Sequence, residues 1–155
     1  MCAIRGANGF RAWLRKALID TNVVLDALAQ REPWAHEAQD LLFLAACGKL
    51  ELYLSGSTIT DVYYLVSKYV THDRARSAEI VDTLMQSLPV VNVGMRECLF
   101  AAHSRIGDYE DAVVAEAARS AQLSHIITRN VDDFAYSEVP AITPHDYLAL
   151  HVKRC

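Results

Sequence analysis

Two apolar runs meet at three polar residues in the stretch Ala17-Leu18-Ile19-Asp20-Thr21-Asn22-Val23-Val24-Leu25. The first run is typical of a buried parallel strand, and the polar residues that follow it mark the start of a helix. Open α/β sheets bind their ligands at such junctions, beyond the carboxyl ends of the strands. Asp20 therefore stands where a side chain can face a ligand, although an Asx turn or a helix cap would require the same residue type.

The rest of the chain alternates between short apolar segments and helical patterns. Segments rich in Leu, Ile and Val predict buried strands at residues 17–19, 50–54, 90–93, 125–128 and 141–143. Helical patterns lie at residues 34–47, 58–70, 74–88, 95–106 and 111–121, and a short last helix is expected from near Pro144. Strands that alternate with helices predict an α/β fold with right-handed crossovers and a parallel sheet covered on both faces.

Length and composition predict one compact domain. The chain has 155 residues, of which 52% are hydrophobic and 22% are charged, enough to bury a single sizeable core. No apolar run approaches the roughly 18 residues that a membrane span needs, so no membrane partner is expected. We expect a basic extension at residues 1–16 without the apolar core of a secretory signal, a domain at 17–150 and a tail at 151–155.

Cysteine spacing and net charge narrow the function classes. The four cysteines lie far apart and form neither a zinc pattern nor a disulfide framework, which favours reduced thiols in the cytoplasm. The six histidines show no zinc-binding spacing either. A net charge of −4 disfavours binding to nucleic acid, unless the acidic residues gather at one place where a metal ion can bridge them to phosphate.

Acidic residues recur at the predicted helix starts, namely at Asp20, at Asp61 and at Asp108 with Asp111. Each has a capping role as its alternative, because Thr58-x-x-Asp61 resembles a capping box and Asp108 has N-cap spacing to Asp111. Helix starts share the carboxyl edge of a parallel sheet, so these carboxylates are expected to meet there. Crowded carboxylates raise one another's pKa, and a divalent ion removes that cost. The pattern is therefore compatible with a Mg²⁺ site suited to phosphodiester hydrolysis, and helix capping stays the alternative.

Four segments together resemble the PIN domain family, with the order and spacing of the small bacterial VapC-like toxins. They are Leu18-Ile19-Asp20-Thr21-Asn22-Val23-Val24-Leu25-Asp26, Ser57-Thr58-Ile59-Thr60-Asp61-Val62-Tyr63-Tyr64, Asp108-Tyr109-Glu110-Asp111-Ala112 and Ile127-Thr128-Arg129-Asn130-Val131-Asp132-Asp133-Phe134. The resemblance implies a three-layer α/β/α domain with a five-stranded parallel sheet. It also implies Mg²⁺- or Mn²⁺-dependent endoribonuclease activity on an RNA substrate, and an antitoxin protein as partner.

The resemblance assigns catalytic positions to Asp20, Asp61 and Asp111, with Asp108 as a nearby metal-binding helper. Asp61 stands where the family more often has glutamate, so its carboxylate is one methylene shorter. The fourth acidic position is Asn130 here, and its amide can offer a metal only a neutral oxygen. Whether one or two metals bind is therefore left open by the sequence.

Asp133 lies three residues further on and is a second candidate for that fourth charge. The alternative is that the Asp-Phe pair caps a turn and buries Phe134. Side chains expected to hold the carboxylates or to contact substrate are Thr21, Asn22, Thr128, Arg129 and Asn130, with Arg129 as the candidate phosphate contact.

Two other protein classes share parts of this pattern. A phosphoacceptor receiver domain also needs a lysine after its last strand, and none follows here until Lys153. A non-catalytic PIN-fold module that binds RNA or protein is the second alternative, and Asn130 is the feature that supports it. A homodimer through Trp34, Leu41, Phe43 and Leu44 is a further hypothesis, for which core packing would require the same residues.

Overall fold

The computed structural model describes residues 16–152, which form a five-stranded, all-parallel sheet in the order β3-β2-β1-β4-β5. The strands are β1 (Lys16–Ile19), β2 (Glu51–Ser55), β3 (Val90–Val91), β4 (His125–Ile127) and β5 (Ala141–Ile142). All five expected strands are present, with ends that differ by up to two residues. The N-terminal extension before Lys16 and the tail after Val152 lie outside the described residues.

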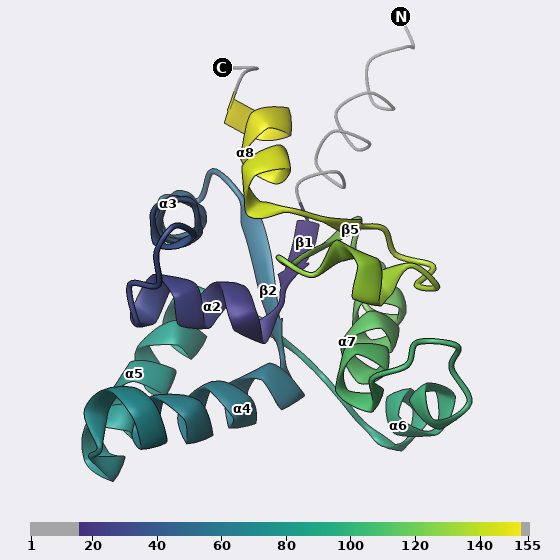
Figure 1. The fold of residues 1–155 in the computed structure, drawn as a ribbon, viewed down its shortest axis with the longest axis horizontal. Helices are drawn as coiled ribbons and strands as arrows, with labels where there is room; N and C mark the ends of the chain where they lie inside the picture. Colours follow the sequence, from purple (N-terminus) through teal and green to yellow (C-terminus); the bar gives the residue numbers. More distant parts are fainter. Residues whose placement is uncertain (1–15, 153–155) are drawn as a thin grey trace, which may run out of the picture.

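Helices cover both faces of the sheet, which makes the three-layer α/β/α fold expected from the sequence (Figure 1). The described helices are α2 (Thr21–Leu28), α3 (Ala35–Ala46), α4 (Gly56–Val66), α5 (Arg74–Ser87), α6 (Met95–Ala102), α7 (Tyr109–Ser120) and α8 (Pro144–Val152). Two short elements, η1 (Ser67–Thr71) and η2 (Val131–Phe134), complete the list.

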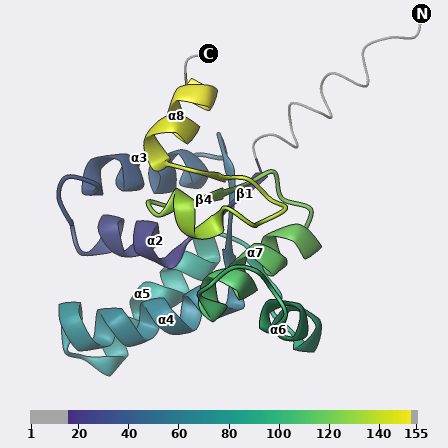
Figure 2. The ribbon, with the colours of Figure 1, turned by 45° about the vertical axis from the view of Figure 1, so that its right-hand side comes forward.

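Alternating side chains of β1 divide the core into two parts. Ala17 and Ile19 pack with residues of α2, α3, α4 and α5, whereas Leu18 points to the other face and packs with residues of α6 and α7. Leu18 and Ile19 are both completely buried, as a central strand requires. Figure 2 shows α6 and α7 grouped together, away from α2 and α3.

Several helix ends differ from the sequence-based expectation. Helix α4 begins at Gly56 because the Ser55 hydroxyl accepts the Thr58 N–H at 3.0 Å, so the expected start at Thr58 is wrong. The helical run expected to Val70 changes at Val66 into the π-helical turn η1. Helix α6 ends at Ala102, four residues earlier than expected.

The strand order creates a crevice at the carboxyl edge of the sheet. The chain passes outward from β1 to β2 and β3, and then crosses to β4 and β5 on the other side of β1. A sheet of this kind binds ligands where the two directions separate, which here is between β1 and β4. Ile19 pairs with Ile127 in that register, so Asp20 and Thr128 leave the sheet side by side.

No helix in the described part of the chain is both long and apolar enough to cross a bilayer.

Candidate active site

A cleft of about 680 Å³ opens at the crevice between β1 and β4. Six carboxylates line it, from the end of β1, the start of α7 and the η2 segment: Asp20, Asp108, Glu110, Asp111, Asp132 and Asp133. The other lining residues include two arginines, a tyrosine and amides: Arg31, Arg105, Tyr136, Asn22 and Asn130. The crowding of acidic groups expected at this edge is therefore present in one cleft.

Asp20 is held rigidly at the bottom of the site and is only 6% exposed. Its Oδ1 accepts the Thr21 N–H at 2.7 Å, which makes it the N-cap of α2. Its Oδ2 accepts the Thr128 hydroxyl at 2.8 Å and the Asn22 side-chain amide at 2.8 Å. Burial raises the pKa of Asp20, and the bonds from Thr128 and Thr21 oppose that rise. The capping and ligand-facing roles predicted for Asp20 are therefore compatible.

The first turn of α7 supplies three of the six carboxylates. Asp108 is its N-cap, as predicted, because one oxygen accepts the N–H groups of Glu110 at 2.8 Å and Asp111 at 3.2 Å. Burial, together with the negative charges of Asp20, Asp108, Asp133 and Glu110, raises the pKa of Asp111 to about 7. A carboxyl with this pKa indicates that the cleft repels additional negative charge.

Asp61 lies at the edge of this group instead of inside the cleft. Helix α4 carries it and contacts α7, and a hydrogen bond with Asp61 is the main cause that raises the pKa of Glu110 to about 7. Glu110 therefore stands between Asp61 and the carboxylates of the cleft. The capping-box interpretation of Thr58 and Asp61 is wrong, because Ser55 caps α4.

The Asp133 segment contributes one residue to the core and one to the cleft. Phe134 is 3% exposed and belongs to the core, while Asp133 lines the cleft beside Asn130. The Asn130 N–H donates to the Thr128 hydroxyl at 3.1 Å, which folds the turn after β4 toward Asp20. Thr128 itself is completely buried and is linked to the cleft by hydrogen bonds with Asp20, Asn22 and Asn130.

Arg129 points away from the cleft. Its Nε lies 3.1 Å from Oδ2 of Asp26, a residue that is 1% exposed, although the two groups are not aligned as a hydrogen bond. Its guanidinium lies 4.2 Å from the centre of the Trp34 ring. Burial raises the pKa of Asp26, and the nearby Arg129 lowers it. These contacts favour a positioning role for Arg129, through the turn after β4, over direct contact with a phosphate.

The donor set fits a hard divalent cation in its chemistry, because oxygen ligands that repel one another gain from a positive charge. Within residues 16–152, however, no three His, Cys, Asp or Glu side chains converge into a ready-made metal-binding group. The carboxylates share a cleft without closing on a single point. Asp20, Asp108, Asp111 and Asp133 are the predicted ligands that line it, and Asp61 adjoins them through Glu110.

Glu110 is the main acidic residue that the sequence interpretation left without a role. It lies in the Asp108-Tyr109-Glu110-Asp111 segment at the start of α7. Its side chain faces α4, where it is hydrogen-bonded to Asp61. The signal that could have found it is its position in the first turn of a helix already assigned to the site. Asp132 was also left without a role. Its position next to the assigned Asp133 is the signal that could have identified it.

Comparison with known proteins agrees with this architecture. The PIN domain family model matches residues 16–132, and the chain belongs to the PIN domain family. No curated protein is significantly similar to it in sequence.

Several solved structures share the fold at low sequence identity. VapBC2 from Rickettsia felis, bound to a DNA fragment from its promoter, is 15% identical with a TM-score of 0.64, over 83% of this chain and 98% of the other. A toxin-antitoxin complex from Klebsiella pneumoniae is 23% identical with a TM-score of 0.61, over 83% and 97%. DNA-bound VapBC from Salmonella typhimurium is 18% identical with a TM-score of 0.61, over 83% and 98%.

Proposed function

We propose that this protein is a Mg²⁺- or Mn²⁺-dependent endoribonuclease that acts as the toxin of a toxin-antitoxin pair. The observation that carries the proposal is the crowding of carboxylates around Asp111. Asp20, Asp108, Glu110 and Asp133 line the same cleft, and their negative charges help to raise the pKa of Asp111. Membership of the PIN domain family supports nuclease activity, and the VapBC structures that share the fold support the toxin role.

The residues would divide the work as follows. Asp20, Asp108, Asp111 and Asp133 would hold the ion, with Asp61 acting through Glu110 or through water. A bound ion supplies an activated water and stabilises charge on the phosphate and the leaving oxygen. Thr128 and Asn22 hold Asp20 in one orientation by direct hydrogen bonds. Asn130 offers a neutral oxygen, which supports one ion more strongly than two.

The test is cleavage of a structured RNA with Mn²⁺ by the wild-type protein and by the Asp20→Asn and Asp111→Asn variants. Cleavage should be lost in both variants and after addition of a chelator. Asp82→Asn is the matched control, because Asp82 lies on α5, accepts a hydrogen bond from the Gln86 side-chain amide at 2.7 Å and does not line the cleft. Equal residual cleavage in all four proteins would indicate a contaminating ribonuclease and would contradict the proposal.

The toxin role needs a test of its own. Expression of the wild-type protein in a bacterial host should arrest growth, and expression of the Asp20→Asn variant should not. The partner would be an antitoxin protein that restores growth when both are expressed. We also propose a cytoplasmic location, which the free thiols of Cys47 and Cys98 support.

A non-catalytic module that binds RNA or protein is the second candidate function. Two observations favour it: Asn130 replaces an acidic residue, and no three acidic side chains in the described range converge on one point. Under this alternative, RNA would bind without cleavage in Mn²⁺, and the Asp20→Asn variant would bind as the wild type does.

A further inference from the structure

One part of the cleft wall is neither acidic nor explained by a metal site. The Arg105 guanidinium lies 4.2 Å from the centre of the Tyr136 ring, and both residues line the cleft. Arg105 comes from the connection between α6 and α7, and Tyr136 from the segment after η2. The Tyr136 side chain remains 59% exposed, so ring surface is left for another planar group.

Arg31 enters the same cleft from the connection between α2 and α3, which pack on the opposite face of the sheet from α6 and α7. Within residues 16–152, neither Arg31 nor Arg105 forms an ion pair, although six carboxylates line the cleft. The charge of Arg31 lowers the pKa of buried Asp26, but neither guanidinium is held in an ion pair in the described residues, so both can meet an anionic ligand. Phosphate oxygens are the acceptors that a guanidinium fits best.

We propose that Arg105 and Tyr136 form a stacking platform for an unpaired base of single-stranded RNA, while Arg31 contacts a backbone phosphate of the same strand. The inference deepens the proposed function and rests on it for the choice of RNA. Unpaired bases stack on tyrosine rings and on guanidinium planes. Bases inside a duplex are already stacked on their neighbours, so the platform selects an unpaired strand.

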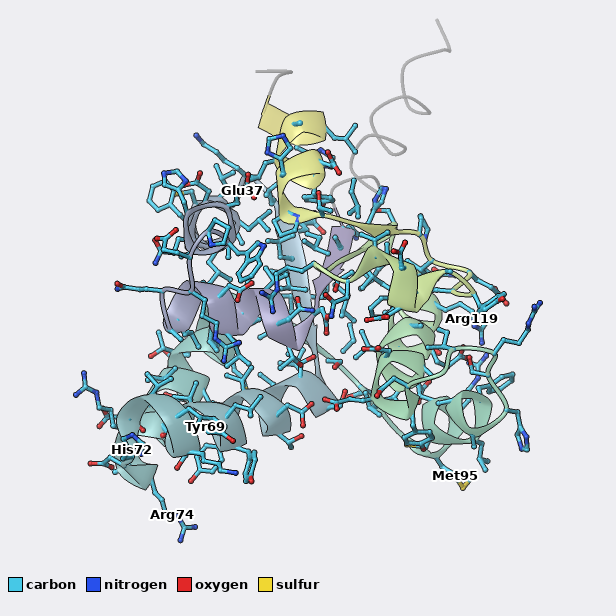
Figure 3. All side chains as sticks on the ribbon, in the orientation of Figure 1. Glu37, Tyr69, His72, Arg74, Met95 and Arg119 are labelled. Carbon is cyan, nitrogen blue, oxygen red and sulfur yellow. The ribbon has the colours of Figure 1, made fainter. Side chains whose placement is uncertain are left out.

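Tyr69 provides a matched control for the platform. It is 58% exposed, and Lys68 Nζ lies 5.1 Å from the centre of its ring, so it also combines an exposed ring with a cation. It lies on η1, at the α4–α5 end of the molecule, far from Arg119 on α7 (Figure 3). Tyr69 does not line the cleft. The two tyrosines therefore differ mainly in position.

The test is fluorescence anisotropy with a labelled 12-nucleotide RNA, either unpaired or annealed to its complement, in chelator and at low salt so that no cleavage occurs. Tyr136→Ala should weaken binding of the unpaired strand about tenfold, as expected for one lost stacking contact. Tyr136→Phe, which keeps the ring, and Tyr69→Ala should bind within about twofold of wild type. Arg31→Ala should also weaken binding and reduce the slope against log salt concentration by about one.

Three results would overturn the inference. They are equal binding by Tyr136→Ala and Tyr69→Ala, duplex binding as tight as binding of the unpaired strand, and no binding of the unpaired strand by the wild-type protein.

The outcome of this test is separable from that of the proposed function. If wild type cleaves RNA in Mn²⁺ while Tyr136→Ala binds normally, the platform fails and the nuclease stands. If Tyr136→Ala loses binding while wild type never cleaves, the nuclease fails and the platform stands.

Discussion

At the scale of single residues, Arg129 shows how a side chain can serve the site from outside it. Its neighbours in sequence, Thr128 and Asn130, form the turn that faces Asp20, but the guanidinium itself lies between Asp26 and Trp34. Asp26 is buried and has no other cation at 4 Å or less in the described residues. Arg129 therefore links the turn after β4 to helix α2 through its contact with Asp26.

Replacement of Arg129 by Ala should lower the free energy of unfolding by about 2 kcal/mol, because the Asp26 carboxyl is left buried without its cation. Urea denaturation at pH 7 measures this loss. The double variant Asp26→Asn with Arg129→Ala should lose less than the sum of the two single variants. Strictly additive losses would show that the two groups do not interact.

The raised pKa of Asp111 predicts an unusual dependence of stability on pH. The pKa of Asp111 is about 7 in the folded protein against an ordinary value of 3.8, so the folded state takes up the proton first as the pH falls. Stability of the metal-free protein should therefore rise from about pH 8 to about pH 6.5, and Glu110 should contribute in the same direction. Below that range His125 opposes the trend, because burial lowers its pKa and disfavours its charged form.

Thermal unfolding in chelator, followed across this pH range, measures the effect. Asp111→Asn should raise the Tm at about pH 8 and flatten the pH dependence, because it removes the buried charge. A wild-type Tm that falls between about pH 8 and pH 6.5, with the same slope in the Asn variant, would contradict the assignment of these shifts.

At the scale of elements, the meeting of α4 and α7 decides which carboxylate can act in the cleft. Asp61 on α4 is hydrogen-bonded to Glu110 in the first turn of α7, and only Glu110 lines the cleft. If the pair acts in the cleft as proposed, the Glu110 side chain, one methylene longer than aspartate, compensates for the short side chain at position 61. Of this pair, the Glu110 carboxylate on α7 lines the cleft, and Asp61 on α4 is hydrogen-bonded to it.

Substitution of this pair should have unequal effects on RNA cleavage. Glu110→Gln should reduce kcat/KM by about tenfold or more, in the range seen when groups that support a metal ligand are lost. Asp61→Asn should have a smaller effect, because its carboxylate acts through Glu110. Single-turnover cleavage in Mn²⁺ measures both, and an inactive Asp61→Asn beside an unaffected Glu110→Gln would reverse the assigned roles.

The elements also show what the sequence could and could not predict. The strands were predictable because β1 and β4 are short apolar runs, and Asp20, Asp108 and Asp111 could be placed at one edge from the direction of the helices alone. The start of α4 was missed because Ser55, still in the strand pattern, is its cap. Side-chain directions were not predictable, since Arg129 pairs with Asp26, a residue 103 positions away.

The platform of Arg105 and Tyr136 was not predictable either. Its residues lie in two connections without periodic pattern, and only the fold brings the guanidinium over the ring.

Composition gave the acidic excess of the chain, but not its concentration in one cleft. That concentration depends on the crossover from β3 to β4, which places the start of α7 beside β1.

At the scale of the whole molecule, helix α3 carries a surface that suggests assembly. Phe43 is 66% exposed and Trp34, just before the helix, is 42% exposed, whereas Leu41 on the same helix is completely buried. Core packing therefore accounts for Leu41 but leaves the two aromatic side chains on the surface. Exposed aromatic groups of this kind are enriched in protein interfaces.

If this surface forms a homodimer, Phe43→Ser should shift the protein from dimer to monomer in sedimentation velocity experiments at micromolar concentration. Phe100→Ser is the matched control, because Phe100 on α6 is also exposed, at 55%, and lies outside this surface. Identical sedimentation of wild type and Phe43→Ser would exclude the α3 surface as the dimer interface.

The proposed nuclease function depends most on a divalent ion held jointly by the carboxylates of the cleft. Mn²⁺ binding at about pH 8, measured by the electron paramagnetic resonance signal of the free ion, tests this most directly. A shared metal site predicts that wild type and Asp82→Asn bind Mn²⁺ with equal affinity and that Asp111→Asn binds it about tenfold more weakly or worse. Equal Mn²⁺ affinity in wild type and Asp111→Asn would contradict it.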